Sequence, residues 1–283
     1  MKLKFLFLIN LIILLNCTLP VAVFHGLGNA CIFPGMYRMT KYFSKKLNTY
    51  SKCIETGGNI LDWFTSFHTQ AKKGCEAIKS DKNFHGDFSV VGLSQGSLLA
   101  RYIIQKCDMP GKVRSYISIG GPQMGVAKFP HCPSGVICNL INGAIGKSIY
   151  YSIIQNHIGP AGYYKYNHDI ESYINFSSFL ADLNNEKKEK NPEYKKRIMD
   201  LNRILLVKFS EDTMIIPRET AHFEFYDEND EVKLLSETDF YKEDYIGIRK
   251  LVEENKVQFE EFKGDHLSFT YSEVDKYMIP NLK

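Results

Sequence analysis

The segment Gly92-Leu-Ser-Gln-Gly96 constrains the fold of this chain more than any other. It matches the pattern Gly-x-Ser-x-Gly and stands between an expected buried strand, Phe88–Val91, and an expected apolar helix, Ser97–Gln105. Glycines are needed on both sides, because a side chain there would strike the neighbouring strand or helix. The alternative is a glycine-rich turn with an idle serine. The flanking pattern favours a tight turn that projects Ser94 from the sheet edge as a nucleophile.

Short apolar, β-branched runs alternate with helical periodicity along the chain. Pro20–Phe24 ends in a glycine-rich loop, residues 60–80 have helical spacing, and Val113–Ile119 ends at two glycines. The strand pattern returns at Arg203–Phe209. This alternation predicts an α/β protein whose mostly parallel sheet is covered by helices on both faces.

One domain is expected over residues 19–283, with a helical insertion at about 128–200. Apolar residues fall there on one helical face: Ile137, Leu140, Ile141, Ile145, Ile149 and, further on, Ile153. They are expected either to pack as a plain helical cap or to line an apolar groove. The charged segment Asn184–Lys196 predicts a solvated face or loop.

The N-terminus predicts export. Two lysines in Met1–Lys4 precede the apolar run Phe5–Leu15, which ends near Thr18, so residues 1–18 are expected to be a signal peptide. That run is shorter than the roughly 18–20 residues that a membrane span needs, and no second run of the kind follows. The mature chain is therefore expected to carry no membrane span. A formal charge of +3, from 35 basic and 32 acidic residues, argues against a nucleic-acid partner.

Seven cysteines are present, and Cys17 is expected to leave with the signal peptide. An even number in an oxidising compartment predicts disulfides, although six cysteines permit 15 pairings. Cys132 and Cys138 enclose a short loop and form the natural local pair. No Cys-x-x-Cys pair occurs, so neither a metal nor a cofactor is expected. Asn175-Phe-Ser177 is a glycosylation sequon in a compartment that uses it.

A serine hydroxyl is a poor nucleophile without a base, so a histidine is expected downstream. The candidates after the serine are His131, His157, His168, His222 and His266. His266 is favoured, because it follows the strand-like Val257–Phe262 and a turn. The acid is expected in the loop after Arg203–Phe209, where Glu211 and Asp212 compete. Asp212 is favoured, because the matching turn in related hydrolases ends in Asp, an apolar segment and Pro.

The oxyanion of the tetrahedral intermediate needs two backbone donors. One amide follows the nucleophile and belongs to Gln95, and the other comes from the loop after the first strand and belongs to Leu27. His25, in that same loop, is interpreted as a structural hydrogen-bonding residue rather than a second base.

The chain resembles the palmitoyl-protein thioesterases over essentially its whole mature length. The matching segments follow in family order: His25-Gly-Leu-Gly-Asn-Ala-Cys31, Gly92–Gly96, Ile119-Gly-Gly-Pro-Gln-Met-Gly125, Phe129-Pro-His-Cys-Pro133, Phe179-Leu-Ala-Asp-Leu-Asn184, Val207-Lys-Phe-Ser-Glu-Asp212 and Gly264-Asp-His-Leu267. The Phe-Leu-Ala-Asp and Gly-Asp-His-Leu segments are much more specific than Gly-x-Ser-x-Gly.

The resemblance implies an α/β-hydrolase fold with Ser94, Asp212 and His266 as the triad, and Leu27 and Gln95 as oxyanion donors. It also implies the disulfides Cys75–Cys107 and Cys132–Cys138. Elimination leaves Cys31–Cys53, which is our own inference. The family has two adjacent cysteines where this chain reads Cys31-Ile32, so that family bridge cannot form here. The family usually has two glycines at Gly96-Ser97, where a small hydroxyl should be tolerated.

The family's substrates are long-chain acyl thioesters on the cysteines of proteins or peptides, and its usual compartment is the lysosome. The leading hypothesis is therefore a palmitoyl-protein thioesterase in the secretory pathway, either lysosomal or secreted. A secreted lipase or carboxylesterase that cleaves acyl oxyesters is the alternative, because the triad chemistry is shared. A lipid-binding protein without turnover would be expected to have a broken triad, and all three members are present in order.

Overall fold

The computed structural model describes residues 18–129 and 147–282. Six strands form one sheet in the order β2-β1-β3-β4-β5-β8, and every neighbouring pair is parallel. These strands are β1 (Val21–Phe24), β2 (Ser51–Ile54), β3 (Phe88–Leu93), β4 (Val113–Ile119), β5 (Arg203–Phe209) and β8 (Val257–Phe262). A separate antiparallel pair is formed by β6 (Phe225–Tyr226) and β7 (Val232–Lys233). The predicted parallel α/β sheet is confirmed.

Helices connect the strands and cover the sheet. The α-helices are α1 (Pro34–Leu47), α2 (Leu61–Phe64), α3 (Phe67–Lys79), α4 (Gly96–Lys106), α6 (Ser152–His157), α7 (Ile170–Phe176), α8 (Leu180–Leu183), α9 (Pro192–Met199), α10 (Asp239–Lys242), α11 (Ile248–Glu253), α12 (Tyr271–Glu273) and α13 (Ile279–Asn281). The 3-10 helices are η1 (Lys82–Phe84), η2 (Lys147–Tyr150), η3 (Gly159–Tyr163), η4 (Arg218–His222) and η5 (Leu235–Glu237), and η6 (Val274–Met278) is a π-helix.

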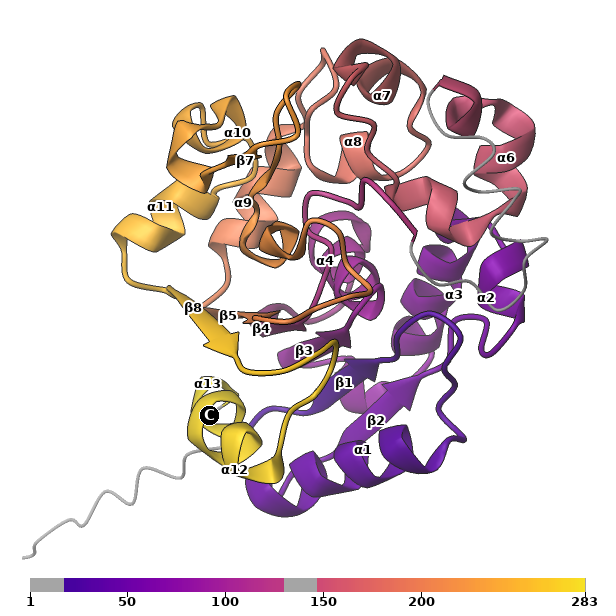
Figure 1. Cartoon of the computed structure of the whole chain (residues 1–283). Helices are drawn as coiled ribbons and strands as arrows, with labels where there is room; N and C mark the ends of the chain where they lie inside the picture. The colour runs from indigo at the N-terminus through magenta and orange to yellow at the C-terminus, as the bar shows by residue number, and fades with distance from the viewer. Residues whose placement is uncertain (1–17, 130–146, 283) are drawn as a thin grey trace, which may run out of the picture.

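Alternate residues of each strand enter two hydrophobic cores, one on each face of the sheet. In β1, Val21 and Val23 pack with α1 and the C-terminal helices, whereas Ala22 and Phe24 pack on the opposite face with α3 and α4. Figure 1 shows α1, α12 and α13 on one side of the sheet and the remaining helices on the other. Burial on both faces explains why the central strands read as continuous apolar runs.

Residues 60–80, expected to be helical, form two helices rather than one. Thr65 is extended, with φ −107° and ψ 127°, and so ends α2. The side chain of Ser66 then accepts a hydrogen bond from the Thr69 amide and begins α3. The break lets α2 turn away from α3, and Trp63 of α2 is buried in a hydrophobic core.

Residues 147–200 of the expected insertion form helices and loops between β4 and β5, apart from an isolated β-bridge of Tyr164 with Val126. Ile149 is buried and Ile153 is 67% exposed. The other four residues of the expected apolar face, Ile137, Leu140, Ile141 and Ile145, lie outside the described residues. Asn184 and Asn185, expected in a solvated segment, are buried, because Asn184 accepts a hydrogen bond from Arg101 and Asn185 donates to Tyr245 O.

Two disulfides link described residues. Cys31 is bonded to Cys53, with 5.5 Å between the Cα atoms, and Cys75 is bonded to Cys107, with 5.9 Å. Cys132 and Cys138, like Cys17 and the rest of residues 1–17, lie outside the described residues. Among the helices of residues 18–129 and 147–282, none has the length and apolar character needed to cross a membrane.

Candidate active site

Ser94 occupies a sharp turn between β3 and α4. Its φ is +53°, in the left-handed region, and its amide donates to the carbonyl of Ile119 at the end of β4. Strain of this kind is typical of a nucleophile held at a strand-to-helix turn. A Cβ on Gly92 would lie 2.3 Å from the Cα of Ser97, and one on Gly96 would lie 2.4 Å from the carbonyl oxygen of His25. Both positions therefore require glycine, as the motif predicts.

His266 and Asp212 meet although they lie 54 residues apart in the chain. His266 Nδ1 is 2.7 Å from Asp212 Oδ2, and the two side chains are 11% and 2% exposed. Asp212 Oδ1 accepts hydrogen bonds from the amides of Met214 and Ile215, each at 2.9 Å, so the carboxylate is fixed in one orientation. Such a pair holds the imidazole with Nε2 free to accept a proton. Glu211, the competing candidate, is exposed.

The other histidine candidates lie elsewhere. His157 is exposed on α6, and His168 lies 3.2 Å from Asp230. His222 lies against the carbonyls of Leu206 and Glu260, in β5 and β8. Burial, reinforced by the charge of Lys208, lowers the pKa of His222 to about 4. His131 falls outside the described residues.

Ser94 and His266 line one cavity of about 140 Å³, which we call the Ser94 cavity. Gly120, at the end of β4, lies close to both residues. A Cβ added to it would lie 3.1 Å from His266 Cε1, and the Ser94 amide donates a hydrogen bond to the carbonyl of the residue before it, Ile119. Within the described residues no hydrogen bond joins Ser94 Oγ to His266 Nε2. Nucleophile–base contacts are often long before substrate binds and tighten in the complex.

The loop after β1 lies directly against the serine. A Cβ on Gly26 would be 3.1 Å from Ser94 Cβ, and Leu27 lines the Ser94 cavity. Among the described residues, neither the Leu27 amide nor the Gln95 amide donates a hydrogen bond to another group of the chain. Both expected oxyanion donors are thus available next to the nucleophile.

Two residues that the sequence did not single out orient Gln95. Its side-chain amide donates to Gln70 Oε1, and its carbonyl oxygen accepts from the Tyr163 hydroxyl, both at 3.3 Å. Gln70 is itself held by the carbonyls of Asp62 and Thr65, each at 2.8 Å. In the sequence, Gln70 and Tyr163 show only that a polar group occurs in an expected helical segment, and this does not indicate that either one contacts the distant Gln95.

Apolar side chains form most of the remaining wall of the Ser94 cavity, which also includes the polar Asn29: Trp63, Val126, Phe129, Met214, Ile215 and Leu267, with the ring of Tyr163. Neither Ile149 nor Ile153 lines it, so the described part of the insertion supplies Phe129 and Tyr163 rather than these two predicted isoleucines. At about 140 Å³ the described walls enclose less than the roughly 300 Å³ at which ligand pockets begin. They account for only the part of an acyl site nearest the serine.

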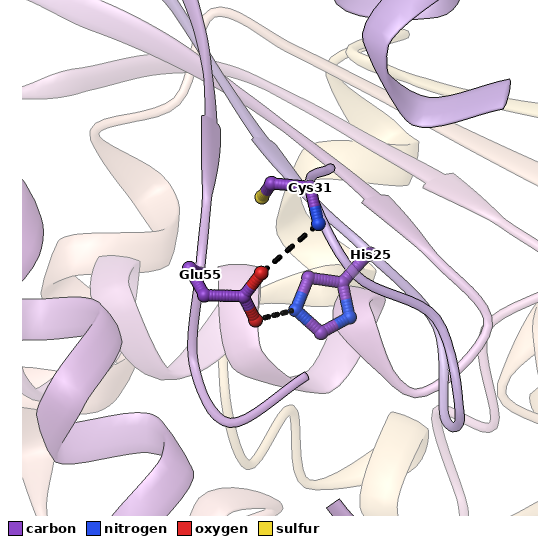
Figure 2. Close-up of side chains that lie close together, drawn as sticks. All are labelled: His25, Cys31 and Glu55. Carbon is purple, nitrogen blue, oxygen red and sulfur yellow. Dashed lines mark hydrogen bonds and ion pairs between the residues drawn. The ribbon is translucent and has the colours of Figure 1, made fainter. Parts of the chain in front are cut away.

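His25 begins the loop after β1 that carries Leu27, and its side chain makes contacts that hold this loop. Its Nε2 lies 2.9 Å from Glu55 Oε1, while Glu55 Oε2 accepts from the Cys31 amide at 3.0 Å (Figure 2). His25, the Cys31 sulfur and Glu55 lie close enough to suggest metal ligands. The sulfur is bonded to Cys53, however, and so cannot act as a thiolate ligand. We assign no metal to this cluster.

Asp62 adds a buried carboxylate to the His25 cluster. Its Oδ1 accepts from the Gly58 amide at 2.9 Å, and its Oδ2 lies 3.8 Å from His25 Nδ1 with no hydrogen-bond partner among the described residues. Burial raises the pKa of Asp62 to about 6, against the attraction of His25. The backbone amide of Gly28 partly offsets this rise in the pKa of Asp62, so the carboxylate lies near the loop that carries Leu27.

A parallel sheet with a serine elbow, an adjacent His–Asp pair and two available amides defines a serine hydrolase of the α/β-hydrolase class. The family model for palmitoyl protein thioesterase matches residues 20–266. This chain belongs to the palmitoyl protein thioesterase family.

The chain is similar to curated thioesterases and, at much lower identity, to a solved lipase structure. Palmitoyl-protein thioesterase 1 of Caenorhabditis elegans is 32% identical over 263 residues, which cover 89% of this chain and 88% of that protein. The Drosophila melanogaster protein named lysosomal thioesterase PPT2 homolog is 32% identical over 171 residues, covering 59% of this chain and 58% of its own length. A monoacylglycerol lipase structure from Paleococcus ferrophilus has a TM-score of 0.47 at 14% identity and covers 93% of both chains.

Proposed function

We propose that this chain is a palmitoyl-protein thioesterase that removes long-chain fatty acyl groups from the cysteines of proteins or peptides. The observation that carries the proposal is the 2.7 Å contact of His266 with Asp212 at the wall of the cavity that holds Ser94, in a member of this family. The same residues and amides supply each step of thioester hydrolysis.

In the first half-reaction, Ser94 Oγ attacks the thioester carbonyl while its proton passes to His266 Nε2. The amides of Leu27 and Gln95 donate to the oxyanion, which carries the charge of the tetrahedral intermediate. When the intermediate collapses, the C–S bond breaks and His266 returns the proton to the leaving sulfur. Asp212 keeps the imidazole in the correct tautomer and offsets its transient charge.

In the second half-reaction, His266 removes a proton from water, and the hydroxide attacks the acyl-Ser94 ester. The same two amides stabilise the second oxyanion. Collapse breaks the bond to Ser94 Oγ, which regains its proton from His266, and the fatty acid leaves. The cycle needs no metal or cofactor to balance its atoms and protons.

The acyl chain supplies most of the affinity in this proposal. Burying one methylene is worth about 0.8 kcal/mol, so the roughly 14 methylenes of a palmitoyl chain offer about 11 kcal/mol before the costs of binding. The apolar walls around Trp63, Phe129 and Met214 suit the first carbons of such a chain.

We propose that the protein works in the lysosome, since relatives are named lysosomal thioesterases and the N-terminus has the pattern of a signal peptide. Asn175 is exposed on α7, as a glycosylated asparagine must be. Peptide mapping of protein purified from a eukaryotic secretory host is expected to find a glycan on Asn175. An unmodified Asn175 would contradict the assignment of this residue as a glycosylation site.

The test is a comparison of kcat/KM for a palmitoyl thioester and for the oxyester that differs in one atom. The thioester is expected to be hydrolysed faster, and the His266→Ala protein serves as the blank. A faster oxyester reaction would identify a lipase or carboxylesterase instead. Absence of both reactions, together with no labelling of Ser94 by a fluorophosphonate, would indicate a lipid-binding protein.

A further inference from the structure

A second cavity, of about 300 Å³, adjoins the Ser94 cavity. It lies along α1, and we call it the α1 cavity. The two cavities share Asn29 and Leu267 in their walls, and Leu267 directly follows His266. A molecule that spans both would therefore pass the imidazole.

The floor of the α1 cavity is apolar. Met36 and Met39 of α1 and Leu93 at the end of β3 are buried there, and the partly buried Phe269 closes one side. Methionine side chains adapt to irregular apolar shapes, which suits a site for varied peptide side chains. An apolar floor with one cation in the wall suits the side chains of a peptide better than a phosphorylated acyl carrier, whose phosphates need several cations.

Arg38 is the one permanently charged side chain in the wall of the α1 cavity. It is exposed, and within the described residues no hydrogen bond or ion pair uses its guanidinium. The sequence of α1 contains further cations, Lys41, Lys45 and Lys46, and no acidic residue. Lys41, Lys45 and Lys46 do not line the cavity, and Lys46 is paired with Asp275, so Arg38 is the cation in the described wall that is free to pair with a carboxylate.

The chemistry of the proposed reaction determines which part of the substrate lies here. His266 must reach the leaving sulfur to protonate it, so the chain attached to that sulfur leaves the site on the imidazole side. Leu267 is the next residue on that side, and it opens onto the α1 cavity. The acyl chain, on the carbonyl carbon, takes the Ser94 cavity.

We propose that the α1 cavity binds the peptide part of an S-acylated substrate, and that Arg38 pairs with an acidic residue beside the acylated cysteine. This inference rests on the proposed thioesterase function. It makes the protein selective for the sequence around the cysteine as well as for the acyl chain.

Binding is tested apart from turnover with the Ser94→Ala protein and peptides that carry an S-hexadecyl cysteine, a thioether that cannot be hydrolysed. Three peptides differ only in a Glu, Gln or Lys next to that cysteine. The Glu peptide is expected to bind about three- to fivefold tighter than the Lys peptide, as for an exposed ion pair. Adding Arg38→Glu should reverse the order. Lys45→Glu is the matched control, because Lys45 lies two turns further along the same face of α1, and it should leave the order of the three affinities unchanged.

A second variant tests the volume of the cavity. Gly35 lines it, and a Cβ added there meets no atom within 4 Å, so the backbone at this position accepts a side chain, and the bulky Gly35→Trp is chosen to obstruct the cavity. In the active protein this variant is expected to lower kcat/KM for a palmitoylated peptide at least tenfold more than for palmitoyl-N-acetylcysteamine, whose leaving group is small. Gly86→Trp is the control, because Gly86 is equally open and lies outside both cavities.

Equal affinity for the three peptides, or an unchanged substrate ratio in Gly35→Trp, would overturn the peptide site and leave the thioesterase proposal standing. Failure of the wild-type protein to cleave palmitoyl-N-acetylcysteamine would instead overturn the proposed function. The peptide assignment would also be refuted by a third result: the protein binds a phosphorylated acyl carrier tightly, Arg38→Glu abolishes that binding, and the three peptides bind equally.

Discussion

Asp265 ties the loop of Thr213 to the loop of His266. Its Oδ1 accepts hydrogen bonds from the Thr213 amide at 2.8 Å, the Thr213 hydroxyl at 2.9 Å and the His266 amide at 2.7 Å. The amides of His266 and Thr213 hold the pKa of Asp265 below its ordinary range. One exposed carboxylate thus connects the turn of the proposed acid to that of the proposed base.

Asp265→Ala is therefore expected to lower kcat by about 10- to 100-fold with little change in KM, since a displacement of about 1 Å at a reacting group costs about that much. Steady-state kinetics with a palmitoyl thioester measures both values. Asp87→Ala is the control, because Asp87 joins Lys112 and Arg114 in the same manner away from the site. An equal loss in both variants would mean that Asp265 acts only on stability.

Asp212→Asn is expected to lower kcat by about 10⁴, because the amide no longer stabilises the imidazolium or selects its tautomer. Glu211→Gln makes the same chemical change at the adjacent exposed position and should leave kcat within about twofold. Comparable losses in the two variants would return Glu211 to consideration as the acid.

Ser94→Ala is expected to abolish turnover while Tm changes little, because the hydroxyl makes no hydrogen bond that supports the fold among the described residues. Thermal unfolding and thioester hydrolysis are measured on the same preparation. A fall in Tm of more than about 5 °C would show that the hydroxyl also serves stability, contrary to its assignment as a nucleophile alone.

The free energy of unfolding should depend on pH through Asp62. Because its folded-state pKa is about 6 and its ordinary value 3.8, the folded protein binds more protons between pH 4 and 6, so stability falls as pH rises through that window. The groups facing the carboxylate are His25, Glu55 and the Gly58 amide. Asp62→Asn should remove on the order of 2 kcal/mol of this dependence.

Chemical denaturation of the wild type and of Asp62→Asn at pH 4.5 and pH 7 measures the effect. The variant should be stabilised relative to wild type more at pH 7 than at pH 4.5. A larger relative gain at pH 4.5 would reverse the sign and contradict a raised pKa. Glu55→Gln is a useful comparison, because hydrogen bonds from Cys31 and the charge of His25 lower the pKa of Glu55 despite its partial burial.

The central strands could be predicted from sequence because burial on both faces leaves continuous apolar runs. The bounds of β4, β5 and β8 agree with the predicted runs to the residue. The edge strand β2 has no such run, since Lys52 and its neighbours face solvent on one side. The break between α2 and α3 is equally hidden, because the apolar spacing continues through Thr65 and Ser66.

The proposed triad could be predicted because the order of its members and the turns around them can be read directly from the sequence. The groups that support the triad could not be predicted in this way. Gln70, Tyr163 and Asp62 act through partners between 25 and 68 residues away, and no local pattern distinguishes them from ordinary polar residues. Likewise Arg101 lies in the apolar helix α4, and its burial depends on Gln123 and Asn184 from other segments.

The close fit of Gly92 and Gly96 against their neighbours sets where this enzyme can diverge. The backbone beneath Ser94 leaves no volume for even one extra carbon, so any variant with new selectivity must inherit that turn unchanged. Met214 at the mouth of one cavity and Gly35 in the wall of the other have the freedom that the turn lacks. Random libraries aimed at new substrates should therefore vary positions such as Met214 and Gly35 rather than the turn.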